Sequence, residues 1–179
     1  MARQQTAARR YAEAAFELGR ADGTLDEWER DLGRLRDLLA NDEVRRLAIH
    51  PAIPFATKER VFERLVGKEV APGPLRLVLL MIRRGRPRAV PSMIDHFEAL
   101  LRRERGISRA LVRTARALDE KQRTALMALL GELTGDRIEL SETVDESLIG
   151  GIAVRIGDEL YDASVRSRLE RLRARLTAV

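Results

Sequence analysis

The stretch that decides the fold spans residues 144–166 and reads VDESLIGGIAVRIGDELYDASVR. Its glycine pair, Gly150 and Gly151, lets the backbone turn sharply and approach a neighbouring segment where side chains would clash. From residue 152 to residue 156 the large apolar residues alternate with smaller or charged ones. That alternation predicts a strand with one buried face.

The end of the same stretch predicts a hairpin that leads into a helix. Gly157 and Asp158 form a two-residue turn of favoured composition, and a return strand follows over residues 160–161. Asp162 or Ser164 then caps a terminal helix by accepting backbone N–H bonds. The apolar face of this helix consists of Val165, Leu169, Leu172 and Leu176.

Upstream of this stretch, the hydrophobic period changes from helical to alternating near Gly106. A strand is expected over residues 110–114, a helix from a cap at Asp119 to Gly135, and a second strand around residues 138–141. The order of elements is therefore β-α-β-β-β-α, which is typical of a small α/β domain. We expect this domain to occupy residues 106–179.

Residues 1–105 predict a bundle of six helices joined by short connections. The expected starts are a Thr6 cap, a capping box at residues 24–27, an Asn41 cap and Thr57. The fourth helix is expected to turn Val61, Phe62, Leu65 and Val66 inward and to end at Gly67. Prolines 72 and 74 start a fifth helix that is apolar nearly all round, and the sixth runs to Gly106. The predicted fold class is thus mainly α, with a six-helix bundle followed by a small α/β domain.

Composition excludes several kinds of chemistry. The chain of 179 residues has no Cys, which excludes disulfides, thiolate metal sites and cysteine nucleophiles. His50 and His96 are its only histidines, too few for a metal site without carboxylate help. The one Gly-Lys pair, Gly67-Lys68, lacks the other residues of a phosphate-binding loop, and the glycine pair at 150–151 lacks a dinucleotide fingerprint. We therefore predict no catalytic, cofactor-binding or metal-binding residues.

Charge and hydropathy leave two classes of partner open. The chain carries 33 basic and 28 acidic residues, a net charge of +5, and nearly all the basic residues are Arg. An Arg-rich chain is compatible with nucleic-acid binding, but acidic residues are interleaved almost everywhere, unlike a basic face. The longest apolar run, residues 77–82, is far too short to span a bilayer. We expect a soluble cytosolic protein without direct membrane insertion.

The 144–166 stretch resembles a motif of the delta subunit of bacterial F-type ATP synthases, the counterpart of the mitochondrial oligomycin-sensitivity-conferring protein. The matching residues are Asp145, Leu148, Ile149, Gly150, Gly151, Gly157, Asp158, Asp162, Ser164, Val165, Arg166, Leu169 and Leu172. Residues 8–17 are similar to that family's opening helix, and Gly85-Arg86 also fits. One departure is Ala163, where the family usually has Gly. This difference bears on how tight the turn before the last helix is.

The resemblance implies a non-catalytic stator subunit that joins the catalytic head to the peripheral stalk on the cytoplasmic face of the cell membrane. The helical bundle would hold an N-terminal helix of an alpha subunit in a groove between the first and fifth helices. The matching positions are Ala8, Tyr11, Ala15, Leu77 and Leu80. The C-terminal domain would bind the C-terminal region of the b subunit, with no nucleic acid and no cofactor involved. The alternative is a small Arg-rich nucleic-acid-binding protein, whose affinity would depend steeply on salt.

Overall fold

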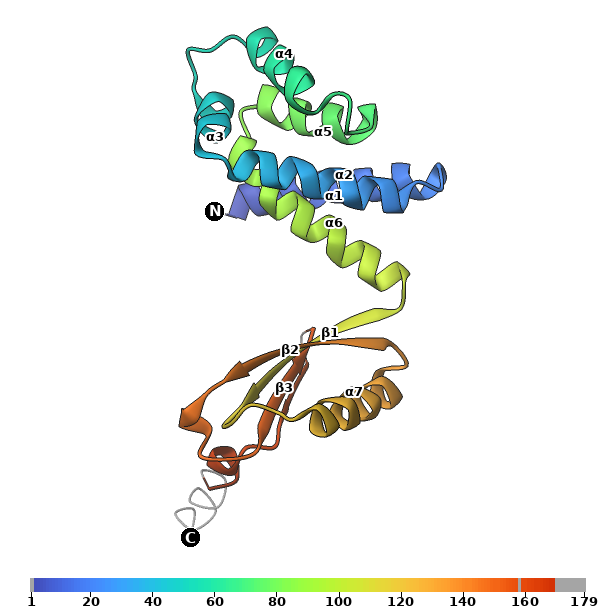
Figure 1. Ribbon diagram of the computed structural model, residues 1–179, viewed down its shortest axis with the longest axis vertical. Helices are drawn as coiled ribbons and strands as arrows, with labels where there is room; N and C mark the ends of the chain where they lie inside the picture. Colours follow the sequence, from blue (N-terminus) through green and yellow to red (C-terminus); the bar gives the residue numbers. More distant parts are fainter. Residues whose placement is uncertain (1, 158, 170–179) are drawn as a thin grey trace. The chain divides into compact units, whose positions relative to one another are not determined.

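The computed structural model describes residues 2–157 and 159–169, and its chain divides into two compact units, residues 1–101 and 102–179 (Figure 1). The second unit thus begins at residue 102, four residues before the boundary at residue 106 that we expected from the change of hydrophobic period. Each unit has its own cluster of buried apolar side chains. The two units are therefore described separately.

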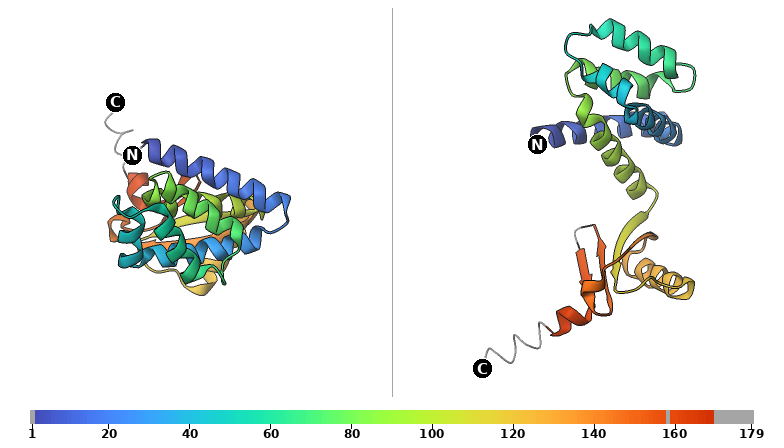
Figure 2. Two further views of the ribbon diagram at one scale, coloured as in Figure 1. Left: turned by 90° about the horizontal axis from the view of Figure 1, so that it is seen from above. Right: turned by 60° about the vertical axis from the view of Figure 1, so that its left-hand side comes forward.

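Within the described residues, the first unit is built from α-helices with one 3-10 turn, η1 (Pro87–Ala89). The helices are α1 (Ala2–Ala21), α2 (Leu25–Ala40), α3 (Asp42–Ile49), α4 (Phe55–Val66), α5 (Pro72–Arg83) and α6 (Val90–Glu104). Helix α2 contacts α1, α3 and α5, and η1 contacts α1, α3 and α5 (Figures 1 and 2). The six-helix bundle predicted from the sequence is confirmed.

An aromatic cluster lies at the centre of this bundle. The ring of Phe97 on α6 meets Phe16 of α1 edge-on at 6.2 Å between ring centroids and stacks with Trp28 of α2 at 6.3 Å. Gly19 and Gly73 let Trp28 approach α1 and α5, because a Cβ at either glycine would lie 3.0 Å from the indole ring. Two helices thus pack closely around one large side chain.

The helix ends in the first unit follow the sequence in part. Asn41 caps α3 as predicted, since its Oδ1 accepts bonds from the N–H groups of Glu43 and Val44 at 2.9 and 3.4 Å. Two other predicted starts are wrong, since Thr6 lies inside α1 and Thr57 is the third residue of α4. Helix α2 starts directly after Thr24 as predicted, but the Thr24 side chain makes no cap bond. Thr24 has φ −113° and ψ 24°, which is not the extended conformation in which a cap side chain reaches back to the first turn.

One residue expected in the core of the bundle lies outside it. Leu65 on α4 is 47% exposed, whereas Phe62 and Val66 on the same helix are buried as predicted. A short surface helix buries one stripe, so an apolar residue at the edge of that stripe stays in contact with solvent.

The second unit contains a four-stranded mixed sheet with α7 (Glu120–Thr134) and the 3-10 turn η2 (Glu146–Leu148). The strands are β1 (Ile107–Thr114), β2 (Arg137–Val144), β3 (Ile152–Ile156) and β4 (Glu159–Asp162). Their order in the sheet is β2-β1-β3-β4, with β1 parallel to β2, and antiparallel pairing between β1 and β3 and between β3 and β4. A last helix starts at residue 165 and is described to residue 169.

Helix α7 packs on the sheet through one side. Its buried residues Leu126 and Leu130 join a cluster with strand residues Ala110, Val112, Ile138 and Val154. A capping box at Asp119 and Gln122 starts the helix, and Gly135 ends it with φ 74°, as the sequence predicted. The predicted order β-α-β-β-β-α is confirmed, although β1 begins three residues earlier than expected because it pairs with β2 along its whole length.

Candidate partner-binding surfaces

The five residues expected to bind a partner helix lie on α1 and α5, which contact each other. Ala8 and Ala15 are completely buried, so they belong to the core and a docked helix cannot touch them. Tyr11 and Leu77 are half-buried and pack against the same buried cluster. Leu80 is 40% exposed. Of the five, Tyr11, Leu77 and Leu80 are thus available to a partner.

Sequence reasoning missed one apolar residue on α1. Leu18 is 55% exposed and lies seven residues after Tyr11, a spacing that places both on one side of a helix. That spacing is the signal in the sequence for Leu18, whereas the Ala-rich stripe on the same helix is buried in the core. The name α1–α5 surface is used below for Tyr11, Leu18, Leu77 and Leu80.

Basic residues accompany the exposed part of α5. Arg76 and Arg84 are exposed and lie four residues before and after Leu80, so they flank it along the helix. The guanidinium carbon of Arg83 lies 5.6 Å from the centroid of the Phe55 ring at the start of α4, a cation–π contact. Helix α5 contains no acidic residue. This edge of the α1–α5 surface is therefore positively charged.

The glycine pair of the family motif brings two backbone segments together in the second unit. Gly151 has φ +80°, and a Cβ there would lie 2.6 Å from the carbonyl oxygen of Ala163. The Gly150 carbonyl accepts a bond from Val165 N–H, and the Ile152 carbonyl accepts one from Ala163 N–H, both at 2.9 Å. The close approach predicted from the pair is thus present at Gly151, and it joins the start of β3 to the start of the last helix.

The other motif residues hold this junction. Ser164 is buried, and its Oγ accepts a bond at 3.2 Å from Ser167 N–H, so it caps the last helix. Asp162 accepts bonds from Ser164 N–H at 2.9 Å and from the Ser167 hydroxyl at 2.6 Å. Gly157 has φ +58°, and Ile156 pairs with Glu159, which fits a two-residue turn. Asp158, Leu172 and Leu176 lie outside the described residues.

Asp145 fixes the turn that precedes the glycine pair. Its carboxylate accepts bonds from the hydroxyl and the N–H of Ser147, at 2.6 and 3.1 Å, and lies 3.4 Å from an Nη1 of Arg113. The Ser147 hydroxyl bond, the Ser147 N–H bond and the charge of Arg113 hold the pKa of the Asp145 carboxyl below its ordinary value. These bonds cap the start of η2, and Ile149 follows directly after the end of η2.

Ile149 has an unusual conformation for its residue type. Its φ is +64°, which β-branched residues rarely adopt, and its side chain is 70% exposed. It borders a hollow of 430 Å³ that is also lined by Leu118, Ile152 and the glycine pair. Val165, 38% exposed, lies across the pair with its Cγ2 3.3 Å from where a Cβ of Gly150 would be. The name motif-end surface is used below for Ile149, Val165 and this hollow.

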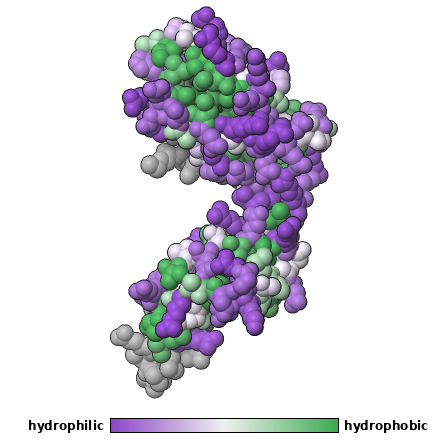
Figure 3. Space-filling view, viewed as in Figure 1, coloured by the Kyte–Doolittle hydropathy of each residue, from purple (hydrophilic) through white to green (hydrophobic). Residues whose placement is uncertain are grey.

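The described residues contain no group of three or more His, Asp or Glu side chains that could hold a metal ion. Figure 3 shows apolar side chains gathered in patches among charged ones, on the face turned to the viewer, in each of the two units. Exposed apolar patches of this kind are typical of surfaces that bind other macromolecules. These patches are therefore candidate docking surfaces.

Comparisons with known proteins agree with this geometry. The family model described as ATP synthase delta (OSCP) subunit matches residues 7–176. An ATP synthase subunit delta of Salinibacter ruber is 38% identical over 97% of this chain and 92% of the relative. That of Cupriavidus metallidurans is 36% identical over 99% of this chain and the whole of the relative.

A solved structure is similar over nearly the whole chain as well. A chain in the cryo-EM structure of the Toxoplasma gondii mitochondrial ATP synthase hexamer matches with a TM-score of 0.70 and 25% identity, covering 96% of this chain and 98% of that one. None of these relatives supports the nucleic-acid-binding alternative. The chain belongs to the ATP synthase delta (OSCP) family and is a non-catalytic stator subunit of an ATP synthase.

Proposed function

We propose that the α1–α5 surface binds an N-terminal helix of an alpha subunit in the catalytic head. The observation that carries this proposal is that Leu80 is 40% exposed on a helix whose other large side chains are mostly buried. Tyr11 and Leu77 extend the apolar area while resting on the core, so they are held in place before a partner arrives. An amphipathic helix that lays its apolar face on such anchors is a common mode of peptide recognition.

The charge at the edge of this surface adds an expectation about the partner helix. Arg76 and Arg84 flank Leu80. Opposite charges at the rim of an interface raise the association rate and fix the register of the bound helix. The alpha-subunit helix is therefore expected to carry acidic residues beside its apolar stripe.

Titration of a synthetic alpha-subunit N-terminal peptide into the full chain tests this proposal. Tyr11→Ala combined with Leu80→Asp removes one anchor and places a charge in the interface, so binding should be lost while the helical circular dichroism is kept. Leu65→Asp is the matched control, because Leu65 is similarly exposed but lies on α4. Unchanged affinity in the double variant would place the peptide elsewhere.

We further propose that the second unit binds the C-terminal region of the b subunit through the motif-end surface. The support is the exposed apolar pair Ile149 and Val165 beside a hollow of 430 Å³. Backbone strain such as that of Ile149 is concentrated at functional sites, where the surrounding structure maintains it. Acting at both surfaces, the subunit would hold the head against rotation with the rotor.

A pair of charge substitutions tests the stalk contact. Ile149→Asp should weaken binding of a soluble b-subunit fragment at least tenfold, because it puts a charge into an apolar contact. Leu129→Asp on α7 is the control, since Leu129 is 54% exposed and lies outside the motif-end surface. Equal weakening by both variants would assign the contact to a broader area of the second unit.

In this role the chain would sit at the cytoplasmic face of the cell membrane as a peripheral part of the complex. Among the described residues, no helix combines the length and apolarity needed to cross a bilayer. The proposed attachment is therefore through partner subunits. Salt-washed membranes should retain the protein only when the other stalk subunits are present.

A further inference from the structure

The first unit has a second hollow that uses none of the residues of the α1–α5 surface. It measures 360 Å³ and lies between the end of α2, the α3 helix, η1 and the start of α6. Its floor is apolar: Leu39 is 6% and Ala48 1% exposed, and Ile49, Pro87 and Pro91 complete it. The name Arg-flanked pocket is used for these five residues with Arg45 and Arg88. A hollow of this size lies at the small end of the range of ligand pockets in proteins, about 300–1,000 Å³.

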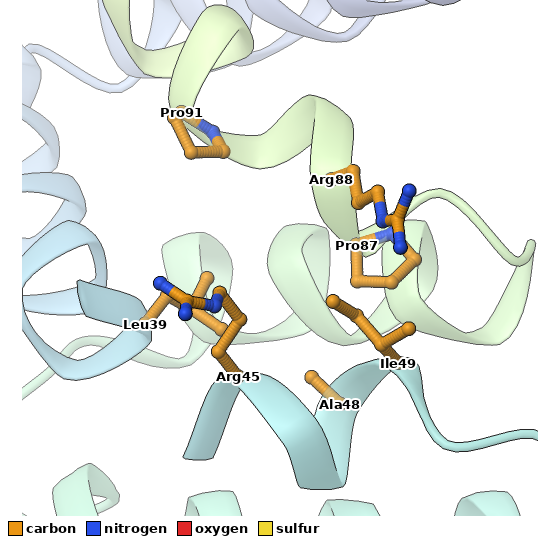
Figure 4. A pocket seen from close by; sticks show the side chains of 7 residues that line it. All are labelled: Leu39, Arg45, Ala48, Ile49, Pro87, Arg88 and Pro91. Carbon is orange, nitrogen blue, oxygen red and sulfur yellow. The ribbon is translucent and has the colours of Figure 1, made fainter. Parts of the chain in front are cut away.

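Two guanidinium groups stand at the mouth of this pocket. Figure 4 shows Arg45, from α3, and Arg88, from η1, on different sides of the hollow. Arg45 pairs with Asp42, one turn earlier on the same helix, at 2.5 Å. Arg88 forms no ion pair with a described residue, and none of the residues that line the pocket is acidic. The uncompensated charge at the mouth is therefore that of Arg88, and the floor is apolar.

The walls of the pocket are fixed before anything binds. Lys58, only 8% exposed, donates a bond at 2.9 Å to the Ala48 carbonyl and so ties the last turn of α3 to α4. The Asn41 side chain caps the start of α3. On the opposite wall, Pro87 has a fixed φ, and η1 is closed by the bond from Ala89 N–H to the Arg86 carbonyl at 3.0 Å. A preformed pocket loses little conformational entropy on binding.

We infer that the Arg-flanked pocket is a second docking site, for an acidic amphipathic peptide segment of a partner protein. An apolar anchor side chain of the segment would fill the floor between Leu39 and Ile49. A carboxylate three or four residues away on the same helical side would pair with Arg88. Asp42 already pairs with Arg45, so the uncompensated charge of Arg88 is what favours this occupant over a basic or neutral helix.

Two synthetic amphipathic peptides serve as probes. One has leucines four residues apart flanked by glutamates, and its twin has lysine at every glutamate position. Both are titrated into the full chain carrying Tyr11→Ala and Leu80→Asp, which removes the α1–α5 surface as a competing site. Fluorescence anisotropy measures affinity, and the amide NMR signals of Leu39, Ala48 and Ile49 locate the bound peptide. The acidic peptide should bind and shift these signals, and the basic twin should not.

Three substitutions test the assignment. Arg88→Glu should weaken the acidic peptide about tenfold or more, and Ile49→Ala severalfold. Arg46→Glu makes the same charge change on α3 outside the pocket and should change affinity less than twofold. The inference is overturned if Arg46→Glu weakens binding as much as Arg88→Glu, or if both peptides bind equally. It is also overturned if sodium octanoate alone produces the same shifts and displaces the peptide, because the site then takes a small carboxylate.

Discussion

Ile149 occupies a conformation that costs about 1–3 kcal/mol for a residue with a side chain, yet its side chain is mostly exposed. Ile149→Gly removes this strain, since glycine adopts positive φ freely, and the side chain that it removes is 70% exposed. We predict that the variant unfolds at higher urea concentration, with a gain of about 1 kcal/mol, and binds the b-subunit fragment more weakly. Lower stability with unchanged binding would mean that Ile149 serves the fold alone.

Gly151 illustrates a second kind of glycine requirement. Gly151→Ala combines a positive φ with a Cβ 2.6 Å from the Ala163 oxygen, and should cost about 3 kcal/mol of unfolding free energy. Gly135→Ala is the matched control, because its φ is also positive but nothing lies within 4 Å of the added Cβ. That variant should lose about 1 kcal/mol. If both variants lost the same unfolding free energy in denaturant, the close approach to Ala163 would not explain the need for glycine at position 151.

Asp145 gives the second unit a dependence on acid. Because its pKa in the folded chain is lowered from the ordinary 3.8, the stability it contributes is present above that value and is lost as the pH falls through the folded-state pKa. We predict that the stability difference between the native chain and Asp145→Asn shrinks below pH 3.8. Ser147→Ala should move the Asp145 carboxyl titration, followed by NMR, to higher pH. If the Asp145 titration did not shift, the Ser147 hydroxyl bond would not be the main cause of the lowered pKa.

Among the motif residues, the roles of the glycines and the capping residues can be predicted from the sequence, whereas the conformation of Ile149 cannot. Gly150 and Gly151 form a pair that signals close backbone approach, and Asp162 and Ser164 are ordinary capping residues. The positive φ of Ile149 could not be expected, because β-branched side chains disfavour that conformation and only the surrounding bonds impose it.

At the scale of elements, the residues before α2 and α3 are both of types that favour helix caps, but only Asn41 forms cap bonds with its side chain. Asn41→Ala should cost about 1 kcal/mol, since its side chain satisfies two N–H groups of α3. Thr24→Ala should change the unfolding free energy by less than about 0.5 kcal/mol, because Thr24 makes no side-chain cap bond. Thermal or urea unfolding of the two variants compares them. A loss at Thr24 equal to that at Asn41 would contradict the described cap geometry.

Element type and order followed from hydrophobic period, but the exposed residues at the edge of an apolar stripe did not. On α7 the leucines at 126 and 130 are buried, whereas Leu129 and Leu133 are 54% and 61% exposed. All four belong to one broad apolar arc, and the sequence does not say which half of it meets the sheet. The same ambiguity made Leu65 look like a core residue.

At the scale of the molecule, the chain has two units with separate cores and proposed docking surfaces on each. The helices that carry the proposed head-binding surface were expected from the family resemblance alone. Burial then removed Ala8 and Ala15 from that surface and brought Leu18 into it. The Arg-flanked pocket could not be predicted, because its residues come from four elements that only the fold brings together.

The most direct test of the stator role is ATP-driven proton pumping in membrane vesicles from which this subunit has been removed. Adding back the native chain should restore proton pumping. With the Tyr11→Ala, Leu80→Asp variant, ATP hydrolysis should continue but should not drive proton pumping. Leu65→Asp should restore pumping as the native chain does. If the double variant restored pumping fully, or if pumping never depended on the added chain, the account would be contradicted.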